Sequence, residues 1–153
     1  PFGRLLISAL PLNLRFDAVV PMPMHWLRRW RRGFNQAELL ARAVAKHAGL
    51  PCLKALRRTR SVPAQAGLTA AQRRRNTTGT FAIARRKLAL EGRHILLVDD
   101  VLTTGSTARA ASAVLKRAGA GRVTVLTLAR ADRRHYLGDV SGGQSYTIAL
   151  GAR

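Results

Sequence analysis

The chain has 153 residues, which fits a single domain and suffices to bury a sizeable core without disulfide bonds. It carries 27 Lys and Arg residues against seven acidic ones, a net charge of +20. Its single cysteine, Cys52, excludes an intramolecular disulfide and a cysteine-rich metal site. No apolar run reaches the roughly 18 residues that a membrane span needs, so we expect a cytoplasmic domain.

The positive charge is concentrated in one region. Between His25 and Arg75 the sequence has thirteen Lys or Arg residues, and Glu38 is the single acidic residue. Such a field attracts polyanions such as nucleic acid, polyphosphate or an anionic membrane surface. An arginine-rich solvated surface without a polyanionic partner gives the same composition, so both interpretations stay open.

In the first half of the chain, "FDAVVPMP" (16–23) predicts a strand closed by prolines. The arginine-rich "HWLRRWRRGFN" (25–35) predicts a loop. Apolar residues recur at helical spacing in 36–50, where a glycine and a proline then stop the helix. A second strand is expected within 52–59.

In the second half, a capping-box pattern predicts a short basic helix over 69–76. Strands are expected at 79–84, 94–101 and 122–130, with a helix over 106–119 and an edge strand at Tyr146–Leu150. Strands alternate with helices, and "ILLV" has no polar alternation. These features predict an α/β fold with a mostly parallel twisted sheet and helices on both faces.

Asp99 and Asp100 stand together at the end of the most apolar strand, directly before "VLTTGST". In a parallel sheet, ligands bind beyond the carboxyl ends of the strands. The loop Thr103–Thr107 leads into a helix N-terminus, where unpaired N–H groups and the helix dipole favour a phosphate. The two carboxylates suit a sugar diol, because its hydroxyls donate. This stretch therefore predicts a ribose-phosphate site.

Other interpretations of the stretch fit less well. A Walker A loop needs a lysine, and a dinucleotide fingerprint needs several spaced glycines where this loop has Gly105 alone. A phosphate-receiving regulator domain needs a third aspartate followed by a lysine, and no lysine follows Asp139. A strand end before a capped helix explains "TTGST" but does not explain two adjacent acids.

The thirteen residues "ILLVDDVLTTGST" (95–107) match the 5-phosphoribosyl-1-pyrophosphate (PRPP) signature of type I phosphoribosyltransferases. The chain more closely resembles the ComF family of competence-associated proteins with a phosphoribosyltransferase domain. That resemblance rests also on "VVPMPMHWLRRWRRGFNQAELLARAVA", on "VLTLAR", and on a spaced set of residues. The set is Arg58, Gln65, Leu68, Arg73, Asn76, Gly79 and Phe81. The resemblance as a whole covers roughly residues 16–130 and implies a type I phosphoribosyltransferase fold.

The resemblance also implies roles for individual residues. Asp99 and Asp100 would hold the ribose hydroxyls, and Thr103, Thr104, Gly105, Ser106 and Thr107 the 5-phosphate. Arg31, Arg32 and Gly33 would face the pyrophosphate. The segment from Arg58 to Asn76, with Gln65 and Arg73, would be a mobile loop over the reacting centre, and Arg73 joins the acid pair as a catalytic candidate. Mg²⁺ would arrive bound to PRPP rather than to direct protein ligands.

The sequence departs from related enzymes at two points. Hypoxanthine-type salvage enzymes carry an aspartate where this chain has Thr103, so an obvious general base is missing and purine salvage is disfavoured. The family's N-terminal zinc ribbon is also absent, so we expect residues 1–153 to be the phosphoribosyltransferase domain alone.

Two functions of different classes follow. The first is Mg²⁺-dependent phosphoribosyl transfer with pyrophosphate release, its acceptor unidentified. The second is a PRPP- or nucleotide-responsive module that binds single-stranded DNA or the uptake machinery during transformation. Trp26, Trp30 and Phe34 among arginines favour the second, because aromatic rings stack on bases, although packing explains them too. A homodimer is left open.

Overall fold

The computed structural model describes residues 14–24, 34–59, 79–85, 88–102, 105–130 and 147–149, with the backbone alone at 101–102, 128–130 and 147–149. Its main sheet has the strand order β1-β4-β5-β6, and each neighbouring pair is parallel. The strands are β1 (Ala18–Pro21), β4 (His94–Leu102), β5 (Arg122–Arg130) and β6 (Thr147–Ala149). The parallel sheet expected from the apolar runs is thereby confirmed.

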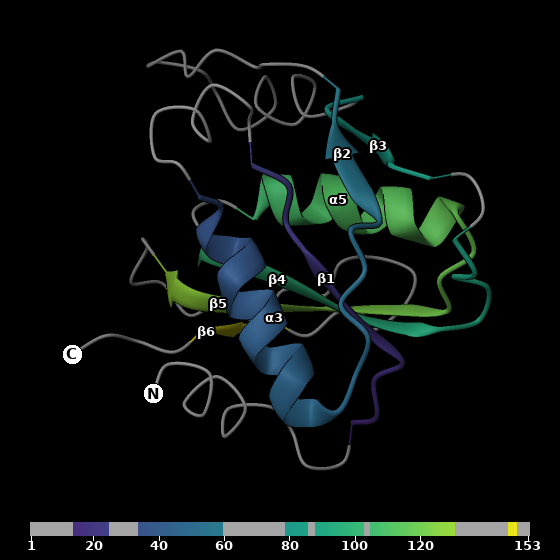
Figure 1. The fold of residues 1–153 in the computed structure, drawn as a ribbon. Helices are drawn as coiled ribbons and strands as arrows, with labels where there is room; N and C mark the ends of the chain where they lie inside the picture. The colour runs from purple at the N-terminus through teal and green to yellow at the C-terminus, as the bar shows by residue number, and fades with distance from the viewer. Residues whose placement is uncertain are drawn as a thin grey trace, which may run out of the picture.

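Strand β4 is buried on both of its faces. Ile95 and Leu97 pack into one hydrophobic cluster, with residues of helix α5 (Ser106–Arg117). Leu96 and Val98 pack into a second cluster, with helix α3 (Gln36–Ala48). Successive side chains of a strand point to opposite faces, so a strand covered on both sides needs the unbroken run "ILLV". Figure 1 shows the two helices on opposite sides of the sheet.

Helix α3 follows from its residue spacing. Its buried positions recur every three or four residues: Ala37, Leu40, Ala41, Val44 and Ala45. The helix ends at Gly49, whose φ of 66° is left-handed and whose N–H donates to the carbonyl of Ala45. This is the stop that the sequence predicted.

Strands β2 (Leu56–Arg58) and β3 (Phe81–Ile83) form a separate antiparallel pair. Leu56 and Phe81 are both buried and belong to the cluster that includes α5. The pair lies beside α5, away from the main sheet (Figure 1). Both strands were expected from the sequence, but their pairing was not. A neighbour in a sheet is chosen by tertiary packing, which a residue pattern does not contain.

The remaining expectations have mixed outcomes. The unit β4-α5-β5 and the edge strand β6 are confirmed. The predicted loop at 25–33 and the basic helix at 69–76 lie outside the described residues. In the part of the chain that the structure describes, no helix is both long and apolar enough to cross a membrane. Cys52 is half-buried against the α3 cluster, and this burial raises the pKa of its thiol.

Candidate functional site

The acid pair lies at the carboxyl end of β4, in the middle of the main sheet. Asp99 is 9% exposed, and the N–H of Asp100 donates to its Oδ1 over 2.9 Å. Burial is the largest cause of a raised pKa at Asp99, and the hydrogen bond and negative charge of the Asp100 carboxyl raise this pKa further. Together they raise the pKa of Asp99 to about 7. The pKa of Asp99 therefore lies near neutral pH, well above that of an ordinary aspartate.

Helix α5 starts almost directly after this acid pair. Gly105 is its N-cap with a φ of 72°, a left-handed conformation that glycine adopts without strain, and the carbonyl of Gly105 accepts from the N–H of Arg109. The first turn contains no acidic residue, whereas Lys116 and Arg117 occupy the last turn. An α-helix does not bond its own first N–H groups, so this end favours an anion.

The N-terminus of α3 differs, although it also lies at the carboxyl end of the sheet. Its first turn contains Glu38, whose carboxylate contacts Lys54 and Arg42 at 2.7 Å each. The hydrogen bond from Lys54 is the largest cause of the lowered pKa of Glu38. This helix end already has a carboxylate of its own. Of the two helices, α5 is therefore the one that suits an external phosphate.

Arg58 on β2 connects the second sheet with the acid pair. Its guanidinium carbon lies 5.3 Å from the centre of the Phe81 ring, a cation–π contact across β2 and β3. Its positive charge also acts on Asp99, where it lowers the pKa against the larger opposing effect of burial. The structure thus brings Arg58 into the electrostatic surroundings of an acid on another sheet.

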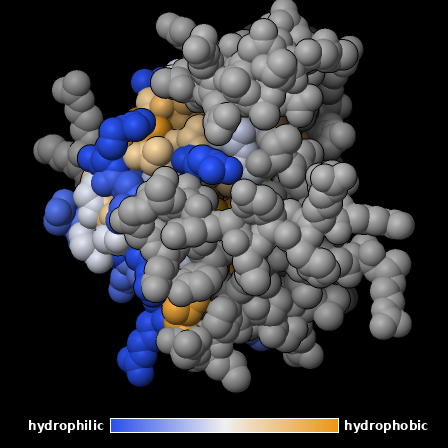
Figure 2. All heavy atoms as spheres, turned by 180° about the vertical axis from the view of Figure 1, so that it is seen from behind, coloured by the Kyte–Doolittle hydropathy of each residue, from blue (hydrophilic) through white to orange (hydrophobic). Residues whose placement is uncertain are grey.

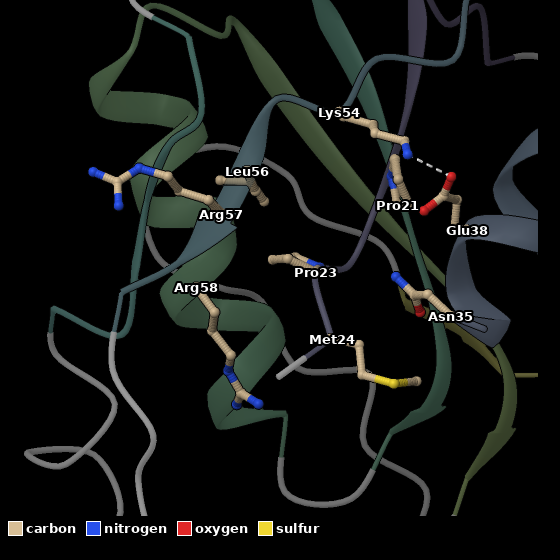
Figure 3. A pocket seen from close by; sticks show the side chains of 9 residues that line it. All are labelled: Pro21, Pro23, Met24, Asn35, Glu38, Lys54, Leu56, Arg57 and Arg58. Carbon is tan, nitrogen blue, oxygen red and sulfur yellow. Dashed lines mark ion pairs between the residues drawn. The ribbon is translucent and has the colours of Figure 1, made fainter. Parts of the chain in front are cut away.

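A cavity of about 200 Å³ lies at the same end of the molecule. It is lined by Pro21, Pro23 and Met24 after β1, by Asn35 and Glu38 at the start of α3, and by Lys54, Leu56, Arg57 and Arg58. In Figure 3 the Arg57 side chain extends to the left, away from the other labelled side chains, whereas the Arg58 side chain extends downward. The cavity has an apolar floor of proline and leucine and several cationic side chains at its rim.

The cavity lies one strand away from the acid pair. The N–H of Met22 donates to the carbonyl of Val98 over 2.8 Å, which places the end of β1 beside the residue before Asp99. The side-chain amide of Asn35 donates to the carbonyl of Met22 over 3.1 Å. Asn35 therefore joins the two ends of the 25–33 segment instead of capping its own helix.

The ends of the 60–78 segment are joined in a similar way. The N–H of Thr59 donates to the carbonyl of Thr80 over 2.8 Å, and the Thr59 hydroxyl donates to the carbonyl of Gly79. Arg58 and Phe81 are paired in the register just inside these residues. Both segments predicted to act as active-site loops therefore start and end around the carboxyl end of the sheet.

The structure places only part of the predicted site. It places Asp99 beside Asp100 and within the electrostatic influence of Arg58, and it places Gly105, Ser106 and Thr107 at the start of α5. Arg31, Arg32, Gly33, Gln65, Arg73, Asn76, Thr103 and Thr104 lie outside the described residues. Sequence reasoning missed the cavity residues Asn35, Glu38 and Lys54. The one sequence feature that could have pointed to them is Glu38, the single acidic residue of the basic region. Its ion pairs with Arg42 and Lys54 explain its presence there.

A model of the phosphoribosyl transferase domain family matches residues 31–145. The chain belongs to this family. Solved structures agree with the fold: an adenine phosphoribosyltransferase from Thermoanaerobacter pseudethanolicus matches with a TM-score of 0.63 at 21% identity, covering 98% of this chain and 77% of that one. The type I phosphoribosyltransferase fold expected from the sequence is confirmed.

Two relatives indicate the branch of this family to which the chain is similar. Competence protein F of Haemophilus influenzae is 39% identical over 116 residues, 75% of this chain and 51% of that protein. DNA utilization protein YhgH of Escherichia coli (strain K12) is 41% identical over 117 residues, 74% of this chain and 49% of that protein. The resemblance to ComF proteins is thereby confirmed. The chain spans about half the length of these relatives.

Proposed function

We propose that this domain binds PRPP and transfers its phosphoribosyl group, with release of pyrophosphate, to an acceptor not yet identified. The observation that carries the proposal is the buried Asp99 with the half-buried Asp100 beside it, a few residues before the start of α5, whose first turn lacks acids. One end of the ligand would be a phosphate and the adjoining part a diol. A ribose 5-phosphate has these two groups in this order.

The pyrophosphate would lie on the side of β1 and β2. Arg58 has its charge there, and the cavity around it is bordered by both ends of the 25–33 segment, which carries Arg31, Arg32 and Gly33. Arginine binds phosphate oxygens through two parallel hydrogen bonds. The 60–78 segment with Gln65, Arg73 and Asn76 would cover this side, because its ends are anchored beside Arg58.

The charges fit the chemistry of the transfer. When the bond between ribose carbon 1 and the pyrophosphate oxygen breaks, positive charge builds on the ring and negative charge on the leaving group. The acid pair would face the ring and the arginines the leaving group. The electron pair of the acceptor forms the new bond to carbon 1, and the acceptor loses a proton to solvent or to a neighbouring base.

We propose that magnesium enters this site with its ligand rather than as an ion held by the protein. Among the described residues, no three His, Cys, Asp or Glu side chains come together as a metal cage. Mg²⁺ bound to PRPP would offset the charge of the pyrophosphate, and Asp99 and Asp100 would hold the sugar beside it.

Calorimetric titration with Mg²⁺–PRPP tests the proposal. The wild-type chain should bind, and the double variant D99N/D100N should lose affinity at least about a hundredfold, because two charged carboxylates are replaced by neutral amides that each keep one acceptor oxygen. The control is Asp17→Asn at the opposite end of the sheet, where the Asp17 carboxylate accepts from the N–H of His94 over 2.7 Å. Equal affinity of wild type and double variant would refute the ribose assignment.

Pyrophosphate release tests the transfer itself. PRPP and Mg²⁺ would be incubated with a panel of nucleobases, amines and phosphate acceptors, and free pyrophosphate measured for wild type and D99N/D100N. Pyrophosphate release that occurs in the wild type only when an acceptor is present, and that is lost in D99N/D100N, supports catalysis. PRPP binding without release across the panel would leave a binding domain and contradict the transferase proposal.

A second candidate function is a module that binds single-stranded nucleic acid. Its support is the net charge of +20 and the Phe34 ring, which is 51% exposed beside α3. Arg42 and Lys46 are exposed on the same helix. Figure 2, which views the molecule from behind, shows further hydrophilic side chains next to small apolar patches. Gel-shift titrations against single strands at several salt concentrations test it, since phosphate contacts weaken steeply as salt rises. No shift even at low salt would exclude this function.

A further inference from the structure

We propose that Thr127 is a positioning residue for Asp99, its buried hydroxyl donating a hydrogen bond to the Asp99 carboxylate once a ribose diol is bound. The inference rests on the proposed PRPP site and adds a residue that the PRPP signature does not contain. Thr127 lies on β5, the strand after α5, and its side chain is fully buried.

The sheet register places the two residues side by side. Asp99 on β4 is the direct partner of Thr127 on β5, and the two strands are parallel. Paired residues of neighbouring parallel strands point to the same face and lie about 4.8 Å apart. Two residues earlier on each strand, Leu97 and Val125 share the cluster that packs against α5. Asp99 and Thr127 therefore both face the α5 side, as direct neighbours across the two strands.

The Thr127 hydroxyl is one of two buried hydroxyl groups in the described part of the chain that have no hydrogen-bond partner, the other being that of Ser112 on α5. Other buried threonines are satisfied: Thr124, three residues earlier on β5, has its hydroxyl 2.9 Å from Nε2 of His94. A buried polar group left unsatisfied destabilises a fold, so its presence calls for an explanation. The explanation that we infer is that Thr127 donates to the Asp99 carboxylate, which becomes charged when the ligand binds.

Ligand binding changes what Asp99 needs. In the free protein the carboxyl shares a hydrogen bond with Asp100, and near-neutral protonation reduces its demand for donors. Ribose hydroxyls that donate to the pair displace this proton, leaving an ionised carboxylate that is nine-tenths buried. A carboxylate accepts up to about four hydrogen bonds. The Asp100 N–H supplies one, the sugar supplies another, and Thr127 supplies a third from the interior.

The test compares Mg²⁺–PRPP affinity in wild type, Thr127→Val and Thr127→Ser by calorimetry. Valine keeps the shape of threonine without its hydroxyl, so affinity at pH 8 should fall roughly tenfold, the usual effect of losing a hydrogen bond to a charge. Serine keeps the hydroxyl and should restore affinity to within about threefold of wild type. At pH 5.5, where Asp99 is protonated, the loss in Thr127→Val should shrink, because the bond is then to a neutral group.

Melting temperature separates this role from plain packing. Removal of an unsatisfied hydroxyl should leave the free Thr127→Val protein at least as stable as wild type, so that binding falls while stability does not. The matched control is Ser112→Ala on α5, which removes another buried hydroxyl without a hydrogen bond and should leave affinity unchanged. Thr127→Ala serves as a second hydroxyl-free variant if the valine side chain does not fit.

The outcomes distinguish the two proposals. Failure of wild type to bind Mg²⁺–PRPP would overturn the proposed function and this inference with it. Wild-type binding with equal affinity in Thr127→Val, or an equal loss in Thr127→Ser and Thr127→Val, would overturn this inference alone. A loss confined to the hydroxyl-free variants and largest at high pH supports it.

Discussion

The guanidinium of Arg58 lies over the ring of Phe81, and these two residues are register partners across β2 and β3. They close the base of the 60–78 segment at the point where Arg58 also reaches the charge of Asp99. A residue at the root of a predicted active-site loop is thus coupled to the predicted ribose site on a different sheet. Loop and acid pair can influence each other through this one side chain.

Replacing Arg58 by methionine should weaken Mg²⁺–PRPP binding about tenfold, because a half-buried positive charge beside the proposed anionic ligand is removed while the apolar stem stays. The pKa of Asp99 should also rise further, since Arg58 holds it down. The pH midpoint of PRPP binding, measured by calorimetry, reports both effects. Arg117→Met is the control, because Arg117 is exposed in the last turn of α5, at the end of that helix away from the candidate site. A comparable loss in both variants would point to general charge rather than to this position.

Affinity for Mg²⁺–PRPP should increase with pH between about 6 and 8. Burial and Asp100 raise the pKa of Asp99 to about 7, and a protonated acid must lose its proton before it accepts from two sugar hydroxyls. Isothermal titration in two buffers of different ionisation enthalpy should show proton release on binding at pH 7. A flat affinity profile with no proton release would contradict a protonated pair in the free protein.

Asp99→Asn should stabilise the free protein at pH 8 while it weakens ligand binding. The folded-state pKa of Asp99 is raised above its unfolded value, so the folded chain binds more protons between about pH 4 and 7, and stability falls as pH rises through that window. Asparagine removes the buried charge, and the melting temperature at pH 8 should rise by roughly 3 °C or more. At pH 4 the side chain at this position is neutral in the folded wild type as well as in the variant, so the difference in melting temperature should disappear.

Gly105→Ala should lower stability and PRPP affinity together. Gly105 has a φ of 72°, and a left-handed alanine is strained by about 1 kcal/mol. Gly49→Ala is matched to it: Gly49 has a φ of 66°, caps α3, and has no atom within 4 Å of an added Cβ. Thermal unfolding should show similar losses in both variants, whereas calorimetry should show a loss of affinity in Gly105→Ala alone. Equal affinities would argue against a phosphate at the start of α5.

Acid should destabilise the end of the sheet opposite the candidate site. The His94 ring lies tilted against the Phe16 ring with ring centres 4.5 Å apart, and its Nε2 lies 2.9 Å from the Thr124 hydroxyl. Burial lowers the pKa of His94. Its folded-state pKa lies below the unfolded value, so the unfolded chain binds more protons and stability falls as pH drops below about 6.5. Melting curves from pH 5 to 8 should show this slope in Asp99→Asn, where the opposing slope of Asp99 is absent. His94→Gln in that background should flatten it.

The sequence by itself determined the unit from β4 through α5 to β5, the helix α3 and its glycine stop, and the adjacency of Asp99, Asp100 and the "TTGST" loop. Each of these is encoded in contiguous residues, because periodicity, turn chemistry and helix termini act over a few positions along the chain.

Only the tertiary structure decided that β2 pairs with β3, that Arg58 acts on Asp99, that Glu38 is bonded by Lys54, and that Thr127 stands beside Asp99. These neighbours are far apart in sequence and are set by strand order, register and the packing of helices on each face. A one-residue change of register would move Thr127 to the opposite face of the sheet without altering any local pattern. For that reason the ribose-phosphate motif could be predicted from the sequence, and its surroundings could not.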